Sequence, residues 1–455
     1  MVLCMADDQG WGDVGYMGHP VLKTPVLDDM AAHGLRFDRF YAAAPVCSPT
    51  RGSVLTGRHP NRFGCFSWGY TLRPEEVTLA EALHRAGYVT GHFGKWHLGA
   101  VTKTSSVSPG ASGFDEWYSA PNFFDLNPLL SHRGTVESFH GDSSVVTARL
   151  AIPFVREAVK AGKPFLAVVW FGSPHVPHRA LPSDRKPYAD MPERKQNFYG
   201  ELAAMDRAIG MLRDELRRLD IADKTIFWYC SDNGALPVGS TGGLSGKKGN
   251  LYEGGIRVPA IIEWPGRIDM PRRIDMPCST VDIYPTLLEL AGVTVEHQPV
   301  LDGMSLVPLL DGHSMHRTRP LGFWVYPRRG ISTPARRILE RLRAEQQGKE
   351  NVTGPTQADG PVVPLGERFP TDRFPGSAAW IDGRYKLLHL EGKTKAGKGK
   401  TATGKQAHRD LLFDLQRDPA ERHDLSSMLP ERKAKMKEAL RAWQRSVLKS
   451  LNEGS

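Results

Sequence analysis

The 455-residue chain is poor in cysteine, with five residues, and no two of them form a CxxC pair. This spacing argues against the common zinc-binding and dithiol redox motifs, and it leaves a bridge between Cys65 and Cys278 open. The chain also lacks an apolar run approaching the roughly 18 residues that a membrane span needs. We therefore expect a globular protein that has no membrane span.

A recognisable targeting segment is also missing. The strand-like run Val2–Ala6 follows Met1 directly, and no signal peptide is visible in this sequence. We expect an exported protein of the periplasmic, secreted or lysosomal type, with a targeting segment that is absent from this chain.

Positive charge is concentrated in two segments. The formal net charge is +9 at pH 7, and residues 393–405 hold five lysines and no acid. Residues 326–350 carry a net charge of +4, so the two segments account for the whole excess. Each segment is either a solvated mobile surface or a cationic rim for a sulfated polymer. The Lys/Gly tract has no interleaved aromatic residues, which argues against a nucleic-acid partner.

Residues 1–318 alternate short apolar runs with amphipathic segments at helical spacing. The apolar runs include Val2–Ala6, Val89–Phe93, Phe165–Phe171 and Thr225–Cys230. This alternation predicts an α/β domain with a large, mostly parallel sheet between two layers of helices. Ligands of such sheets bind at the carboxyl ends of the strands. Polar clusters follow these runs, so we expect the functional site at that edge.

Residues 319–455 have a different pattern. Strands are predicted at Leu321–Val325, Ala379–Leu390 and Leu411–Leu415, followed by a charged amphipathic helix over Leu429–Leu451. This order predicts a smaller C-terminal α+β domain with an antiparallel sheet. We expect irregular basic insertions at about 326–377 and 393–405.

Two acidic motifs follow strand-like runs. Asp7 and Asp8 follow the first run and precede a Gly-rich turn, and Asp232 and Asn233 follow the run that ends at Cys230. Each pair alone is as plausibly a turn. Together they offer three carboxylates and an amide, which are hard oxygen ligands suited to Ca²⁺ or Mg²⁺ rather than to zinc or copper.

The segment Cys47-Ser48-Pro49-Thr50-Arg51 opens a predicted helix that stops at Gly57. A helix N-terminus favours anions, and we expect it to lower the pKa of the Cys47 thiol. The alternative is a structural cysteine beside a loop proline.

Three more motifs carry cationic or titratable side chains. Lys95 and His97 flank a tryptophan and would point to one side of an extended segment, although a basic turn explains either residue alone. A proline-rich, rigid segment holds His175 and His178. The last motif, residues 246–259, contains Lys248.

In their order and spacing, these motifs resemble those of type I sulfatases, a family of the alkaline phosphatase-like superfamily, and in particular its arylsulfatase and N-acetylgalactosamine-6-sulfatase branch. The resemblance covers residues 2 to about 310. It implies that a formylglycine-generating or equivalent maturation enzyme oxidises Cys47 to Cα-formylglycine. It also implies one Ca²⁺ held by Asp7, Asp8, Asp232 and Asn233.

The resemblance further implies a division of roles. Hydrated residue 47 attacks the sulfur of a sulfate ester, and the other catalytic residues are Arg51, His97, His175 and Asp232. Asp232 takes the first proton, His175 protonates the leaving alcohol, and His97 deprotonates the second hydroxyl so that sulfate is expelled. The implied substrate-binding residues are Lys95, Lys248, His178 and Asn122.

We therefore expect a hydrolase that removes sulfate from a sulfated carbohydrate. One alternative is a formylglycine-dependent phosphodiesterase or phosphonate hydrolase. A second cluster of metal ligands would favour this alternative. The other is an inactive sulfatase-like protein that binds sulfated glycan. Binding alone would not need acid and base groups, so intact His97 and His175 argue against this second alternative.

Overall fold

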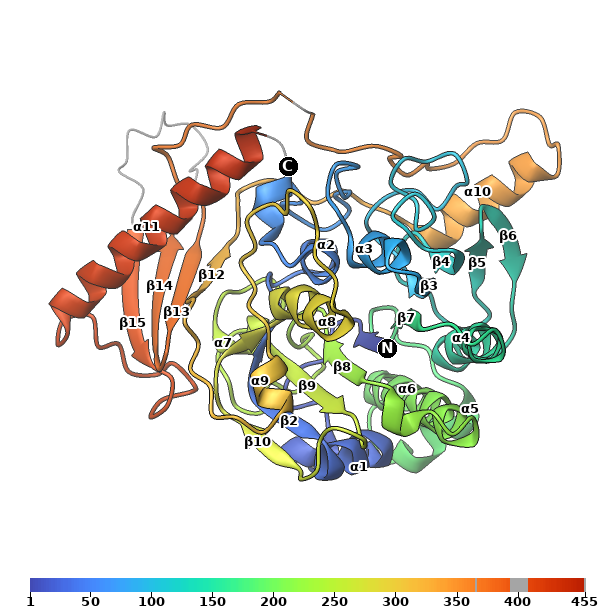
Figure 1. Ribbon diagram of the computed structural model, residues 1–455, viewed down its shortest axis with the longest axis horizontal. Coiled ribbons are helices and arrows are strands. Elements are labelled where there is room, and N and C mark those ends of the chain that lie inside the picture. Colours follow the sequence, from blue (N-terminus) through green and yellow to red (C-terminus); the bar gives the residue numbers. More distant parts are fainter. Residues whose placement is uncertain (365, 393–407, 454–455) are drawn as a thin grey trace.

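The computed structural model describes residues 1–364, 366–392 and 408–453 and contains two sheets (Figure 1). The basic tract at 393–405 lies outside the described residues. The strand order of the larger sheet is β10-β2-β9-β8-β1-β7-β3-β4-β5-β6, with β11 beside β2. No helix within the described ranges is both long enough and apolar enough to cross a membrane.

The centre of the larger sheet is parallel, as the sequence predicts. Its five parallel strands are β8 (Phe227–Ser231), β1 (Val2–Ala6), β7 (Phe165–Trp170), β3 (Val89–Lys95) and β4 (Glu116–Ala120). The flanking strands are β9 (Arg257–Glu263), β2 (Leu35–Tyr41), β10 (Arg272–Ile274), β11 (Cys278–Ser279), β5 (Leu129–His132) and β6 (Thr135–Ser138). Of these, β9 runs antiparallel to β8.

Helices cover both faces because successive side chains of a strand point to opposite sides. Val2 and Cys4 of β1 pack into one apolar cluster, and Leu3 and Met5 pack into another. The first face is covered by α1 (Pro25–His33), α4 (Ser143–Lys160) and α6 (Glu193–Arg218). The second is covered by α2 (Cys47–Thr56), α3 (Leu79–Arg85) and α8 (Ile283–Ala291). Single-turn helices are α5 (Pro182–Arg185), α7 (Glu253–Ile256) and α9 (Val307–Leu310). All five cysteines are free, so the bridge between Cys65 and Cys278 does not form.

The smaller sheet is antiparallel, as predicted. It comprises β12 (Leu321–Trp324), β13 (Ala378–Asp382), β14 (Tyr385–Glu391) and β15 (His408–Asp414), and α11 (Pro430–Glu453) packs against it. The single strand expected at Ala379–Leu390 is wrong, because the chain turns there and forms the hairpin of β13 and β14. Gly383 in this turn has φ +57°, which a glycine adopts without strain.

The insertion after β12 is not irregular throughout, which corrects the prediction for residues 326–377. It contains the helix α10 (Ala335–Gln346), which packs against β5 and β6 at the far edge of the larger sheet (Figure 1). Ile338 and Leu339 of this helix are buried. The insertion therefore carries chain from the smaller sheet across to the other end of the molecule.

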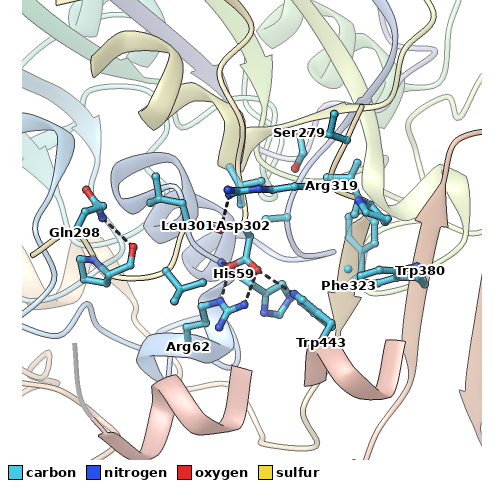
Figure 2. A pocket seen from close by; sticks show the side chains of 18 residues that line it. His59, Arg62, Ser279, Gln298, Leu301, Asp302, Arg319, Phe323, Trp380 and Trp443 are labelled. Carbon is cyan, nitrogen blue, oxygen red and sulfur yellow. Dashed lines mark hydrogen bonds and ion pairs between the residues drawn. The ribbon is translucent and has the colours of Figure 1, made fainter. Parts of the chain in front are cut away.

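Asp302 holds α11 against the chain that follows α2 (Figure 2). Its carboxylate accepts hydrogen bonds from Arg62 Nε at 2.6 Å and Nη2 at 2.8 Å, from the His59 amide at 2.6 Å and from Trp443 Nε1 at 2.9 Å. Burial by itself would raise the pKa of Asp302, but the Arg62 guanidinium outweighs it and lowers the pKa to about 2. The ionised carboxylate thus stabilises the fold.

We expect Asp302→Asn to lower the free energy of unfolding by about 2 kcal/mol at pH 7. The folded pKa lies below the unfolded value of about 3.9. The contribution is therefore complete above pH ~5 and is lost as the pH falls towards 2. Urea unfolding of both proteins between pH 7 and pH 3 measures this. A difference in stability that does not change with pH would contradict the prediction.

Candidate functional site

The polar motifs meet at one edge of the larger sheet. Asp7 and Asp8 follow β1, Asp232 and Asn233 follow β8, and Lys95 ends β3. His175 follows β7. Because β1, β3, β7 and β8 are parallel, their carboxyl ends lie at the same edge, where ligands of such sheets bind. Lys248 is an exception to the expected pattern, since its motif leads into β9. This strand is antiparallel to its neighbours and therefore begins at the same edge.

Cys47 is the first residue of α2, and Arg51 lies one turn further on. The helix ends at Gly57, with φ +68°, as predicted. Arg51 Nη2 donates to Asp232 Oδ2 at 2.7 Å and lies 3.5 Å from Asp7 Oδ1. The thiol sulfur of Cys47 and carboxylate oxygens of Asp7 and Asp232 all lie within 4.8 Å of one another. The start of α2 therefore faces the two acidic motifs.

The thiol of Cys47 does not behave as its helix position suggests. Burial raises the pKa of Cys47, and this effect outweighs the opposing influence of Lys95 and Lys248. The expected lowering is therefore wrong. An unmodified Cys47 is a neutral thiol, which is a poor nucleophile.

Two lysines neutralise the first acidic motif. Lys95 Nζ donates to both oxygens of Asp7, at 2.9 and 2.7 Å, and Lys248 Nζ donates to both oxygens of Asp8, at 2.5 and 2.7 Å. Burial raises the pKa of Asp7 to about 8, against the influence of Lys95. Burial acts on Asp8 in the same direction, but Lys248 and His175 outweigh it and lower the pKa of Asp8. Neighbouring carboxyls with divergent pKa values are typical of functional sites.

The acidic residues also fit a hard divalent cation. Asp7, Asp8, Asp232 and Asn233 are fully buried. Asn233 Nδ2 donates to Asp8 Oδ1 at 2.8 Å, whereas Asn233 Oδ1 is a buried acceptor with no hydrogen-bond partner. Among the described residues, the possible ligand groups are Asp7–Asp8–His175 and Asp7–Cys47–Asp232, and both include Asp7. Oxygen ligands predominate, as Ca²⁺ and Mg²⁺ require.

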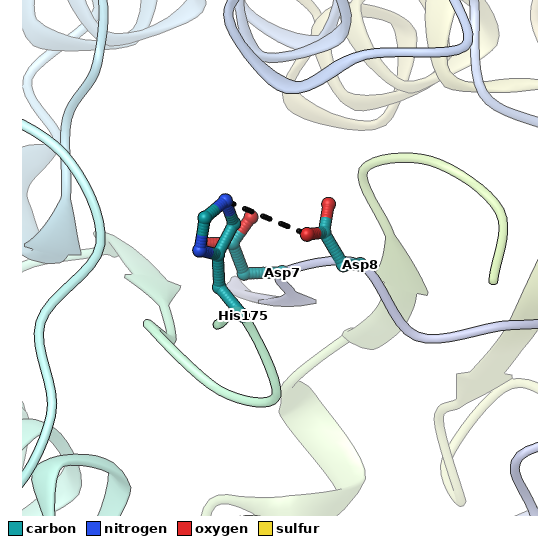
Figure 3. A group of neighbouring side chains, drawn as sticks. All are labelled: Asp7, Asp8 and His175. Carbon is teal, nitrogen blue, oxygen red and sulfur yellow. Dashed lines mark ion pairs between the residues drawn. The ribbon is translucent and has the colours of Figure 1, made fainter. Parts of the chain in front are cut away.

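His175 faces Asp8, with its Nε2 3.5 Å from Asp8 Oδ2 (Figure 3). Its Nδ1 lies 2.6 Å from the Val176 carbonyl oxygen, which only accepts hydrogen bonds, so Nδ1 carries a proton. The ring stacks on Phe123 at a centroid distance of 4.3 Å. Burial lowers the pKa of His175 to about 3. The neutral ring therefore presents the lone pair of Nε2 to the cluster.

His97 contacts Thr333 of the insertion. The segment around it is not extended as predicted, because His97 has φ +55°. Its Nε2 lies 3.0 Å from Thr333 Oγ1, and Asn122 Nδ2 donates to Thr333 Oγ1 at 2.7 Å and to the Thr333 carbonyl at 3.0 Å. His97 Nδ1 is buried without a hydrogen-bond partner. Asn122 thus orients Thr333, and its place in substrate binding stays a prediction.

His178 is not joined to the cluster by a hydrogen bond or an ion pair among the described residues. Its ring packs against Phe198 of α6 and its Nδ1 lies 3.5 Å from Glu201 Oε2. These contacts give no support to the predicted role of His178 in substrate binding.

Three residues beside the site have no signal in the sequence. Thr333 belongs to the insertion, and Phe123 lies in a loop after β4. Trp68 is 38% exposed and lies next to Gly69, whose amide donates to Ser48 Oγ at 2.9 Å. The Ile331 amide donates to the Trp68 carbonyl at 2.9 Å, so Trp68 connects the start of α2 to the insertion. Each of the three reaches its neighbours only through tertiary contacts.

The family model described as Sulfatase matches residues 1–293. N-acetylgalactosamine-6-sulfatase of Sus scrofa is 33% identical to the chain over 467 residues, which cover 94% of this chain and 81% of the relative. Arylsulfatase G of Rattus norvegicus is 28% identical over 488 residues, which cover 95% of this chain and 83% of the relative.

Solved structures resemble the chain over almost its whole length. The crystal structure of Ps i-CgsB in complex with k-i-k-neocarrahexaose has a TM-score of 0.78 at 24% identity and covers 97% of this chain and 92% of its own. The phosphonate monoester hydrolase of Agrobacterium radiobacter has a TM-score of 0.62 at 20% identity and covers 97% of this chain and 95% of its own.

Proposed function

Because this chain belongs to the sulfatase family and has its alkaline phosphatase-like fold, we propose that it removes sulfate from a sulfated carbohydrate through a formylglycine at position 47 and one Ca²⁺. Sulfuric ester hydrolysis follows from the family. The observation that supports the finer proposal is the position of residue 47. Residue 47 is the first residue of α2, and its sulfur lies within 4.8 Å of carboxylate oxygens of Asp7 and Asp232. Arg51, Lys95 and Lys248 form ion pairs with the acidic residues of these two motifs.

The charges at this edge suit an anionic ester. Asp7, Asp8 and Asp232 balance Arg51, Lys95 and Lys248, so the described side chains sum to zero when all six are ionised. Ca²⁺ held by the three aspartates and Asn233 Oδ1 would bring the site to +2 and supply Lewis-acid stabilisation of a sulfate oxygen. Lys95 and Lys248 would then be free to turn from the carboxylates to the ester.

Two different residues around position 47 accept the two protons that the reaction releases. A hydrated formylglycine supplies one hydroxyl for attack on sulfur and a second one whose deprotonation releases sulfate. Asp232, held by Arg51 at 2.7 Å, accepts the first proton. His97 Nδ1, which has no partner in the structure, takes the proton of the second hydroxyl.

His175 and Lys248 act on the leaving group. Lys248 Nζ lies 2.5 Å from Asp8 Oδ1 and His175 Nε2 lies 3.5 Å from Asp8 Oδ2, so both side chains reach the same carboxylate from different segments. Burial keeps the pKa of His175 low without a ligand. A bound sulfate anion would raise that pKa, because it favours the charged imidazolium. His175 then protonates the departing alcohol.

The carbohydrate class rests on the printed names of the relatives and on the rim of the site. Phe123 stacks on His175, and Trp68 is 38% exposed and precedes Gly69, whose amide is bonded to Ser48. The apolar faces of a sugar ring can pack on such aromatic surface. Sulfate release by the matured protein from defined sulfated mono- and oligosaccharides tests the proposal. Activity on an aryl sulfate with none on any saccharide would reject the carbohydrate class.

The metal content tests the cofactor and the alternative function together. We expect one calcium per chain, and we expect a calcium chelator to reduce sulfate release by about 10²-fold or more, because charge stabilisation in a buried site contributes several kcal/mol. Elemental analysis and re-addition of Ca²⁺ measure both effects. Stoichiometric zinc, or two metals per chain, would favour a phosphodiesterase or phosphonate hydrolase instead.

A further inference from the structure

A cavity of about 660 Å³ lies between the smaller sheet and the chain that follows α2 (Figure 2). Its size is within the range of about 300–1,000 Å³ that is usual for ligand sites. His59 and Arg62 line it just beyond the C-terminal end of α2, whereas Cys47 begins that helix. Ten helical residues rise about 15 Å. Ala43, four residues before Cys47, also lines the cavity, but none of the charged side chains of the catalytic edge does, so the two places are distinct.

Aromatic rings from three different elements line the cavity: Phe323 of β12, Trp380 of β13 and Trp443 of α11. The two tryptophan rings lie 5.9 Å apart at 51°. Trp443 is fixed, because its Nε1 donates to Asp302 and its ring covers Gly322, where an added Cβ would lie 2.6 Å from the ring. Phe323 is fully buried, so the aromatic surface open to a ligand comes from Trp380 and Trp443, and such rigid surface suits the apolar faces of sugar rings.

The charge of the lining favours an anion. Asp302 already accepts four hydrogen bonds, and Arg62 is engaged in its ion pair with Asp302. Arg319 donates only to the carbonyl oxygens of Leu301 and Gly303, at 3.2 and 3.3 Å, and forms no ion pair within the described ranges. The α11 helix, which supplies Trp443, carries seven Lys and Arg residues against three Glu.

We propose that this cavity is a second, non-catalytic site for a sulfated saccharide. A sulfate group lies on the Arg319 guanidinium and the sugar ring packs against Trp443 and Trp380. This inference rests on the proposed carbohydrate substrate, since a polymer would supply units for both sites at once. Binding at two places raises the affinity for long chains without any change at residue 47.

Calorimetric titration of hexasaccharides from chondroitin 6-sulfate and κ-carrageenan tests the proposal. The protein carries Cys47→Ala so that the probes are not consumed. We expect Arg319→Gln to weaken binding of a sulfated hexasaccharide about tenfold or more, because the variant loses the charged hydrogen-bond donor that faces the sulfate. Arg319→Glu should weaken it further. Arg445→Gln on α11 removes the same charge outside the lining and should change binding less than threefold.

Three results would overturn the second site: equal losses for Arg319→Gln and Arg445→Gln, equally tight binding of the desulfated hexasaccharides, or no binding of any hexasaccharide. Sulfate release from a monosaccharide sulfate by protein with intact Cys47 keeps the two proposals apart. Arg319→Gln should leave that release unchanged. If sulfate is released and Arg319 does not affect hexasaccharide binding, only the second site is wrong.

Discussion

Replacing Cys47 with alanine is expected to reduce the turnover of any sulfate ester by about 10⁴-fold or more, as losses of a covalent nucleophile do in other hydrolases. The hydroxyls of Ser48 and Thr50 are both held by hydrogen bonds to the backbone, so we expect neither to replace it. Ser48 Oγ accepts a hydrogen bond from the Gly69 amide at 2.9 Å, and Thr50 Oγ1 donates to the Ala44 carbonyl at 3.0 Å. The initial rate of sulfate release measures the loss.

The matched control is the wild-type chain produced without a maturation enzyme. Its thiol is neutral because burial raises the pKa of Cys47, and a thiol also lacks the second hydroxyl that would release sulfate. We expect this protein to be nearly as inactive as Cys47→Ala. Peptide mass spectrometry of active preparations should find an aldehyde or its hydrate at residue 47. Full turnover by protein that carries only unmodified cysteine would refute the mechanism.

His175→Ala is expected to cut turnover of a saccharide sulfate by about 10²–10⁴-fold, the usual contribution of general-acid catalysis. Turnover of a nitrophenyl sulfate should fall much less. A sugar alkoxide is strongly basic and needs a proton as it departs, whereas nitrophenolate leaves without one. Comparing kcat for the two substrates measures this split.

His178→Ala is the control for His175→Ala. It removes the same ring from the same proline-rich segment, but His178 packs on α6 instead of facing Asp8. We expect it to affect both substrates alike. Equal losses on both substrates for His175→Ala would mean that His175 binds the ester without donating a proton.

The central architecture and most of the site could be predicted from the sequence because short-range patterns determine them. Alternating apolar runs define β1, β3, β7 and β8, and parallel strands must bring Asp7, Asp232 and Lys95 to one edge. The position of Lys248 needed the direction of β9, which an apolar run does not reveal.

The remaining features depend on contacts between distant segments. The helix α10 lies in a basic stretch and buries only a narrow apolar stripe, so its sequence looks like solvated surface. Thr333 reaches His97 across 236 positions of chain, and no local pattern records that contact. The raised pKa of Cys47 has the same origin, since the burial that causes it comes from the whole assembled edge.

The burial of Cys47 also sets an order of events during synthesis. The side chain is 2% exposed, and although Asp7 precedes it, Lys95, Asp232 and Lys248 around it all come later in the sequence. Residue 47 therefore leaves the ribosome well before Asp232 and Lys248 do. An enzyme that oxidises this cysteine needs direct access to it, so we expect the modification to occur on the unfolded or growing chain. On the proposed mechanism, we expect a molecule that missed this step before the sheet edge closed to stay inactive until it unfolds.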